Sequence, residues 1–228
     1  HKLCFNLSMT SASFQIRICL SCGLRYPLVE EHPFGTRCPA CLGSTEVAAT
    51  HPLRTENLIP FNDLTPGPLS SPQGAPARRG ELAALLDNIR SAWNVGSIFR
   101  TADGFGLPHL HLCGITPTPA MDALKKTALS AESTVSWSYH KNALAAAQEL
   151  KAGGCRLLAL EESERAIPIH DANLGNKKAI LIAGNEVTGV DPGILEICDQ
   201  ILYIPMRGGK KSFNVAVAFA VAVSQLTL

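Results

Sequence analysis

The sequence predicts an α/β protein with a mostly parallel β-sheet, preceded by a small metal-binding ribbon. From residue 81 to residue 228, short apolar runs alternate with longer segments that suit helices, and this alternation is typical of a parallel sheet with helical crossovers. Before residue 48, two Cys-x-x-Cys pairs are separated by 15 residues. We therefore expect a zinc ribbon over 1–47, a proline-rich linker over 48–80 and an α/β domain over 81–228.

The zinc ribbon is indicated by four cysteines, Cys19, Cys22, Cys38 and Cys41, which have the spacing of a Cys4 zinc site. Each Cys-x-x-Cys turn offers two thiolates and two turns fill a tetrahedral shell, so the zinc is expected to be structural. Two disulfides would require a secreted chain, and a redox-active dithiol would not need a second pair. A segment of about 30 residues cannot build a core alone, so the metal would supply its folding energy.

The linker is indicated by six prolines between residues 48 and 80, because proline interrupts a helix. These are Pro52, Pro60, Pro66, Pro68, Pro72 and Pro76. In the domain that follows, buried strands are expected at 82–86, 110–113, 156–160, 179–183 and 200–204. Helices are expected at 94–105, 120–129, 142–152, 191–197 and 214–226.

The composition is that of a globular protein with no strong basic bias. Of the 228 residues, 46% are hydrophobic, and the formal net charge is +1, which argues against a large basic footprint for nucleic acid. Four adjacent basic pairs can still form local patches that bind RNA, although each pair taken alone is more typical of a solvated surface. They are Arg78-Arg79, Lys125-Lys126, Lys177-Lys178 and Lys210-Lys211. No apolar run approaches the length of a membrane span, so we expect no membrane partner and a cytoplasmic location.

A glycine-rich loop over 204–214 lies between the last predicted strand and the last predicted helix. This arrangement places backbone N–H groups against a polar ligand. It is not a Walker A loop, because Ile204 stands where a glycine is needed and Lys211 precedes Ser212. The dinucleotide fingerprint also fails, because Gly104 and Gly106 are followed by His109 at its third position.

Three segments resemble the motifs of the SpoU/TrmH-type RNA 2′-O-ribose methyltransferases of the SPOUT class. They are residues 94–106, 181–190 and 204–218, in the family's order, and the resemblance covers roughly residues 80 to 228. It implies a C-terminal trefoil knot, although knots are otherwise rare. It also implies S-adenosylmethionine bound in the knot, a homodimer with the active site near the subunit interface, and methylation of a ribose 2′-hydroxyl in tRNA or rRNA.

The resemblance assigns a cofactor pocket to the loops after the strands at 179–183 and 200–204. Gly184 would let the backbone approach the ligand, and the backbone groups of Ile204 and Met206 would read the adenine edge. The other expected cofactor-binding residues are Ser212, Phe213 and Asn214. Ser212 and Asn214 are also placed to cap the last helix, and Gly189 is expected to serve a turn.

The resemblance assigns catalytic roles to Arg100, Asn94 and Glu186. Arg100 matches the family's catalytic arginine, but a guanidinium with a pKa above about 12 resists deprotonation. Gripping a phosphate is chemically easier, so the general base is left open. Asn94 would position Arg100 or the ribose, or else serve as a helix N-cap. Glu186 would lie near the active centre, or else form a salt bridge to Arg100 or Arg207.

Several features leave two interpretations open. Residues 125–132 match a family stretch near RNA or form a solvated helix end. Trp137 and Tyr139 stack on a base or pack in the core, and Cys113, Cys155 and Cys198 are expected to be small buried residues. By analogy with extensions beside SPOUT domains, the ribbon would contact RNA, through Arg17, Arg25, His32 and Arg37, rather than serve for docking or stability. The alternative to an enzyme is an inactive SPOUT and zinc-ribbon module that binds RNA or assists assembly.

Overall fold

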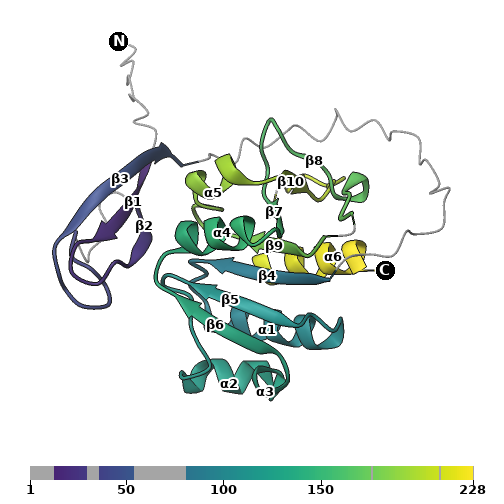
Figure 1. The fold of residues 1–228 in the computed structure, drawn as a ribbon, viewed down its shortest axis with the longest axis horizontal. Helices are drawn as coiled ribbons and strands as arrows, with labels where there is room; N and C mark the ends of the chain where they lie inside the picture. Colours follow the sequence, from purple (N-terminus) through teal and green to yellow (C-terminus); the bar gives the residue numbers. More distant parts are fainter. Residues whose placement is uncertain (1–12, 30–35, 54–80, 176, 211, 228) are drawn as a thin grey trace, which may run out of the picture. The chain divides into compact units, whose positions relative to one another are not determined.

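The computed structural model describes residues 13–29, 36–53, 81–175, 177–210 and 212–227 (Figure 1). The chain divides into two compact units, His1–Thr55 and Glu56–Leu228. Each unit is described by itself. Most of the predicted linker, residues 54–80, lies outside the described residues.

The first unit contains a three-stranded antiparallel sheet in the order β2-β1-β3. Its strands are β1 (Ser13–Cys19), β2 (Arg25–Val29) and β3 (Thr45–Pro52). The predicted end of the ribbon at residue 47 is wrong, because β3 continues to Pro52 and pairs there with Ser13 of β1. Pro52 therefore belongs to the sheet of the ribbon and not to the linker. A proline at the end of an edge strand is tolerated.

The second unit contains a seven-stranded sheet in the order β6-β5-β4-β9-β7-β10-β8, with every neighbouring pair parallel. The predicted α/β architecture with a mostly parallel sheet is therefore confirmed. All five expected strands are present, and β6 and β8 are additional. The strands are β4 (Leu82–Asp87), β5 (His109–Cys113), β6 (Ser136–His140), β7 (Arg156–Leu160), β8 (Ile167–Pro168), β9 (Ala179–Ala183) and β10 (Gln200–Tyr203).

Helices cover both faces of this sheet (Figure 1). They are α1 (Ala92–Gly104), α2 (Asp122–Ala128), α3 (Ala131–Thr134), α4 (Ala143–Ala152), α5 (Pro192–Ile197) and α6 (Val215–Thr227), with a short 3-10 helix, η2 (Ile169–Asp171). Residues of α1, α2, α3 and α6 form one apolar layer with the sheet. Residues of α4 and α5 form the other layer. The central strand β9 is buried along its whole length, as is usual for a parallel strand covered on both faces.

The order of the strands reverses between β4 and β9. From β4 the chain moves outward to β5 and β6, and it then returns to build β7, β9 and β10 on the other side. In open α/β sheets, ligands bind outside the carboxyl ends of strands at such a switch point. The loops that follow β4 and β9 are therefore the first place to look for a site.

Candidate active site and metal centre

Helix α1 begins directly after the loop that follows β4. Ser91 is its N-cap, and the Ser91 hydroxyl accepts a hydrogen bond from the Asn94 backbone N–H at 3.4 Å. Asn94 is thus the third residue of the helix, and its interpretation as an N-cap is wrong. Because a serine already caps the helix, the side chain of Asn94 is free for other contacts.

The Glu186 carboxylate, in the loop after β9, binds the start of α1. It accepts hydrogen bonds from the backbone N–H groups of Arg90 at 2.9 Å and Ser91 at 3.1 Å, and from Asn94 Nδ2 at 2.7 Å. A carboxylate is favourable at a helix N-terminus because of the free N–H groups and the helix dipole. In the part of the chain described by the structure, Glu186 forms no ion pair with Arg100 or Arg207, so that interpretation is wrong.

Asn214 joins the same group of side chains from the start of α6. Its Nδ2 donates to Asn94 Oδ1 at 3.1 Å, and its own Oδ1 accepts from the Ala216 backbone N–H at 3.0 Å. Asn214 therefore caps α6, as predicted, and also contacts Asn94. The network of Asn94, Glu186 and Asn214 joins residues that are 92 and 120 positions apart from Asn94, one from each of the three sequence motifs.

Arg100 does not belong to this network of side chains. It is exposed on α1, on the same stripe as Trp93 and Ser97, because residues three or four positions apart share a helix face. Its guanidinium forms no hydrogen bond or ion pair within the described residues. Trp93 is 77% exposed, which is unusual for so large an apolar side chain.

Gly184 is needed for packing within the protein. A Cβ at this position would lie 2.3 Å from Gly189 C and from Val190 N, so the backbone that approaches Gly184 is the chain's own. Asn185 and Gly189 exchange two backbone hydrogen bonds at 3.0 and 2.9 Å, and Gly189 has a φ of +73°. Gly189 therefore serves a turn, as predicted, since a positive φ favours glycine.

The glycine-rich loop runs from the end of β10 to the start of α6. Ile204 and Met206 are partly buried in it, whereas Ser212 and Phe213 are exposed beside Asn214. Lys211, within the predicted loop, lies outside the described residues. The loop thus places the expected cofactor residues on both sides of its glycines and next to the network of Asn94, Glu186 and Asn214.

Gly96 was not singled out by the sequence reading, although it stands inside the first motif. A Cβ there would lie 2.0 Å from Thr127 Oγ1, and Thr127 Oγ1 also donates to the Ala92 carbonyl at 3.1 Å. Glycine thus lets α1 pack closely on α2. The stretch 125–132 is therefore a packed helix end and not only a solvated one. Glycine destabilises the interior of a helix. Its presence inside a predicted helix was therefore the sequence signal for this close packing.

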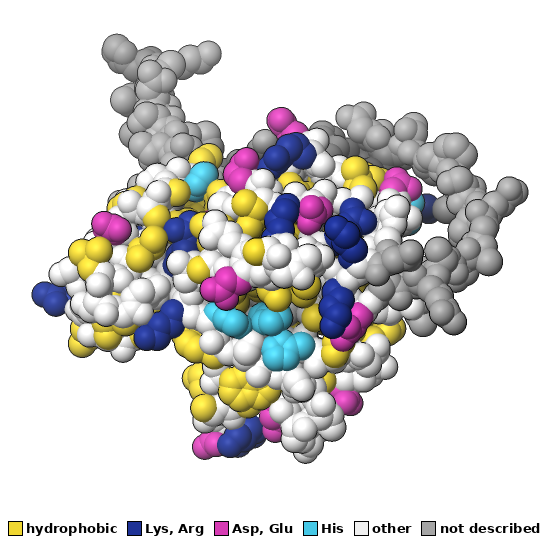
Figure 2. All heavy atoms as spheres, in the orientation of Figure 1, with side chains coloured by type: hydrophobic (Ala, Val, Ile, Leu, Met, Phe, Trp, Pro, Cys, Tyr) yellow, Lys and Arg dark blue, Asp and Glu magenta, His cyan; other side chains and the backbone are white. Residues whose placement is uncertain are grey.

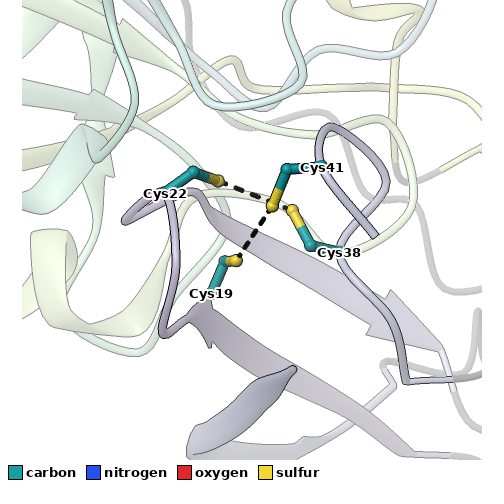
Figure 3. A group of neighbouring side chains, drawn as sticks. All are labelled: Cys19, Cys22, Cys38 and Cys41. Atoms are coloured by element: carbon teal, nitrogen blue, oxygen red, sulfur yellow. Dashed lines mark hydrogen bonds between the residues drawn. The ribbon is translucent and has the colours of Figure 1, made fainter. Parts of the chain in front are cut away.

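The four predicted metal ligands meet in the first unit (Figure 3). Their sulfur atoms all lie within 4.8 Å of one another, with Cys19 Sγ 3.5 Å from Cys41 Sγ and Cys22 Sγ 3.7 Å from Cys38 Sγ. Four thiolates about 2.3 Å from a tetrahedral zinc ion are separated by similar distances. Backbone N–H groups of Cys22 and Ser21 lower the pKa of Cys19 to about 6. The cluster therefore fits a metal ion.

Two arginines expected to contact RNA from the ribbon are buried instead. Arg17 is 7% exposed and Arg25 is 6% exposed. The Arg17 guanidinium donates to Thr45 Oγ1 at 2.8 Å, to the Thr45 carbonyl at 3.1 Å and to Gln15 Oε1 at 2.5 Å. This side chain links β1 to β3, so it cannot serve as a surface contact. His32 lies outside the described residues.

Three histidines on β5 and β6 form a cluster that the sequence reading missed. His109 Nε2, His111 Nδ1 and His140 Nε2 lie 2.9, 3.1 and 2.8 Å from Ser138 Oγ, and Figure 2 shows histidine side chains gathered on the surface. Burial and the neighbouring histidines lower the pKa of His111 to about 4, and burial lowers that of His109. The cluster was missed because β6 was not expected.

The aromatic residues of β6 do not pack in the core. Trp137 is 38% exposed and Tyr139 is 43% exposed, because β6 is an edge strand of the sheet. The Tyr139 hydroxyl donates to the Gly114 carbonyl at 2.9 Å. Among the cysteines outside the cluster, Cys113 is buried as predicted, whereas Cys155 and Cys198 are half-buried.

The fold and the network together define a class of protein: an all-parallel α/β domain in which three motifs meet at a topological switch point. A family model described as "SpoU rRNA Methylase family" matches residues 81–224, and the chain belongs to this family. No helix among the described residues is long and apolar enough to cross a membrane.

Among curated proteins, the chain is 31% identical over 143 residues to the tRNA (guanosine(18)-2′-O)-methyltransferase of Escherichia coli strain K12, covering 63% of this chain and 61% of that enzyme. It is 35% identical over 147 residues to the 23S rRNA (guanosine(2553)-2′-O)-methyltransferase RlmP of Bacillus subtilis, covering 62% of this chain and 56% of that enzyme. The match thus spans less than two thirds of these relatives.

Among solved structures, the chain resembles the A. aeolicus TrmH/SpoU tRNA modifying enzyme, with a TM-score of 0.59 and 25% identity, over 66% of this chain and 75% of that one. It also resembles an AdoMet-bound rRNA methyltransferase from Sinorhizobium meliloti, with a TM-score of 0.61 and 23% identity, over 65% of this chain and 56% of that one. The second likeness concerns the fold alone.

Proposed function

We propose that the chain is an RNA 2′-O-ribose methyltransferase that uses S-adenosylmethionine and acts on tRNA or rRNA. The observation that carries the proposal is the network of Asn94, Glu186 and Asn214, which joins all three family motifs at one place. The relatives named above are methyltransferases of guanosine 2′-hydroxyls in tRNA and 23S rRNA. All the motif residues that the reaction would need are present, which favours an enzyme over an inactive RNA-binding module.

The residues around the loop after β10 fit an adenosyl ligand. The backbone of Met206 forms no hydrogen bond within the described residues, so its N–H and C=O are available to an adenine edge. Together with Ile204 and Asn214 it would hold the cofactor, and Gly184, Ser212 and Phe213 would complete the pocket. When bound, S-adenosylmethionine supplies a methyl group activated by the sulfonium.

The protein's own task is to hold the ribose hydroxyl in line with that methyl group. The exposed guanidinium of Arg100 would grip the phosphate beside the target ribose, because its planar fork suits phosphate oxygens. Both Glu186 oxygens already accept hydrogen bonds: Oε2 from the Arg90 N–H just before α1, and Oε1 from the Ser91 N–H and from Asn94 Nδ2. We therefore assign Glu186 the role of fixing Asn94 and the start of α1, and leave the proton acceptor open.

The proposal includes further parts that rest on the resemblance and on the cysteine cluster. Cys19, Cys22, Cys38 and Cys41 would hold one structural zinc ion, which their spacing supports. The C-terminal segment would form a trefoil knot, the chain would work as a homodimer, and the protein would act in the cytoplasm.

The deciding experiment measures methyl transfer from labelled S-adenosylmethionine to unmodified tRNA and rRNA transcripts, followed by mass spectrometry of the nucleosides. We expect a 2′-O-methyl nucleoside with the wild-type protein and none with Arg100→Ala. Cofactor binding without product on any transcript would favour the inactive module. The same conclusion would follow if the Arg100→Ala protein still supported every function of the wild-type protein in the cell. A wild-type protein that neither forms product nor binds S-adenosylmethionine would contradict the proposal.

A further inference from the structure

The loop after β5 contacts the turn that precedes α1 from outside the site. We infer that Thr116 is a positioning residue for the proposed methyl transfer, because its buried hydroxyl fixes the turn that presents backbone N–H groups to Glu186. This inference rests on the proposed function. Thr116 touches neither Glu186 nor Asn94. It was not among the residues that the sequence motifs indicated.

The Thr116 hydroxyl makes two hydrogen bonds in the interior. It accepts from the Ile89 backbone N–H at 3.1 Å and donates to the Leu86 carbonyl at 3.2 Å. Thr116 is 3% exposed and Ile89 is fully buried, so water cannot replace this partner. The hydroxyl thereby joins the end of β4 to the first residues beyond it, and a buried N–H without a partner is costly.

The turn is also held at Asn88, which donates its backbone N–H to the Cys113 carbonyl at 3.2 Å and its Nδ2 to Asp87 Oδ1 at 2.8 Å. Asn88 adopts a left-handed conformation with a φ of +57°, which is strained for most residues other than glycine and is tolerated by asparagine. Its Oδ1 accepts from the Ile115 N–H at 3.1 Å, and its carbonyl accepts from Asn185 Nδ2 at 2.7 Å. Ile115 and Thr116 therefore pin two consecutive residues, Asn88 and Ile89.

The next two residues of the chain carry the site. Arg90 and Ser91 donate their backbone N–H groups to Glu186, and Glu186 in turn holds Asn94. A shift at Ile89 is passed along the main chain to these two N–H groups, because peptide bonds are planar and leave few free rotations. Thr116 thus sets the position of the carboxylate and of Asn94 without contacting either.

The test compares Thr116→Val with Thr116→Ser. Valine keeps the shape and removes the hydroxyl, whereas serine restores the hydroxyl. For Thr116→Val we expect kcat for methyl transfer to fall by about tenfold or more, because small misplacements at a reacting centre cost rate. The KM for RNA and the Kd for S-adenosylmethionine should stay within about twofold, since the residues proposed to bind these ligands are retained. Thr116→Ser should restore kcat to near the wild-type value.

A stability control separates positioning from general loosening. Ile194→Val, in the apolar layer of α5, removes one buried methyl group and should lower the melting temperature without lowering kcat. Wild-type kcat in Thr116→Val would overturn the inference, as would a loss in Thr116→Val that Thr116→Ser does not restore.

A second readout does not depend on activity. Amide hydrogen exchange over residues 88–94 should be faster in Thr116→Val than in Thr116→Ser or Ile194→Val, because the turn loses its anchor. Unchanged exchange in this segment would overturn the inference. If the wild-type protein transfers no methyl group, the proposed function fails, and the exchange measurement alone decides whether Thr116 holds the turn.

Discussion

Asn94 makes two hydrogen bonds of opposite sense, which an amide can make and a carboxylate cannot. It donates to Glu186 and accepts from Asn214. In Asn94→Asp, a carboxylate would face Glu186 at hydrogen-bond distance, and like charges repel. We expect kcat for methyl transfer to fall by about tenfold to a hundredfold, because the start of α1 loses its fixed position.

The control for this substitution is Asn142→Asp. The Asn142 side chain caps α4 by accepting a hydrogen bond from the Ala145 N–H, and aspartate accepts equally well. Steady-state kinetics on the same RNA should therefore separate the two variants. Equal kcat values for Asn94→Asp and the wild type would contradict the role given to the network.

Gly184→Ala tests how closely the backbone packs around Gly184, because it adds a single carbon atom. The added Cβ would lie 2.3 Å from the backbone of Gly189 and Val190, so the turn must move. Overpacking of this kind costs about 1–3 kcal/mol, and the free energy of unfolding in denaturant titrations should fall by this amount. Gly208→Ala is the matched control, since nothing lies within 4 Å of a Cβ there. Equal losses in both variants would refute the packing argument.

The sequence identified most residues of the candidate site but not how they contact one another. Asn94, Glu186 and Asn214 are each indicated by the motifs, but the partner considered for Glu186, as the alternative to a place near the active centre, is an arginine. Two of the partners of Glu186 are instead backbone N–H groups, which carry no residue-type signal, and the third is Asn94 Nδ2. Thr116 was missed for a related reason, because a lone threonine in a loop has no pattern that predicts a buried hydrogen bond.

At the level of elements, the long periodic segments were predictable and the short edge strands were not. Strand β9 is a continuous apolar run and was located to the residue. Strand β6 places serine and histidine on one face and the partly exposed Trp137 and Tyr139 on the other, so it lacks the continuous apolar run of a buried strand. As an edge strand it is stabilised mainly by pairing with β5, a tertiary contact that a local pattern does not reveal.

The histidine cluster of β5 and β6 should make stability depend on pH. The unfolded chain protonates His111 near pH 6.5, whereas the folded chain does so only near pH 4. Because the unfolded state then binds more protons, the free energy of unfolding should fall as pH is lowered from 6.5 to 4. Denaturant titrations across this range should show a smaller fall for His111→Gln. His170→Gln, an exposed residue outside the cluster, should behave like the wild type; a wild-type fall in His111→Gln would contradict the prediction.

The ribbon is an element whose stability should depend on metal. Cys38→Ser removes one of four ligands, and a segment without its own core should then unfold. Metal analysis should show one zinc ion per wild-type chain and none in the variant, while amide exchange in the sheet of β4 to β10 stays slow. Cys155→Ser, outside the cluster, should keep its zinc. A zinc ion retained by Cys38→Ser would refute the assignment of this ligand.

At the scale of the whole chain, several large apolar side chains near the site are exposed. Trp93 on α1, Phe213 beside Asn214 and Val217 on α6 are 77%, 43% and 48% exposed, and α1 packs against α6. Patches of this kind mark interaction surfaces. Arg100 shares the exposed stripe of Trp93, so a partner on this surface would lie beside the proposed phosphate contact.

A second copy of the chain is the partner that the family resemblance implies. Stable dimers bury on the order of 1,600 Å², and a charge placed inside such an interface is costly. Light scattering of the wild-type protein should therefore give the mass of a dimer, and Val217→Arg should give the mass of a monomer with much reduced methyl transfer. Leu129→Arg, an equally drastic change at a residue that is 65% exposed outside this surface, should remain dimeric and active. A monomeric wild-type protein with full activity would contradict the assignment of this surface to a second copy of the chain.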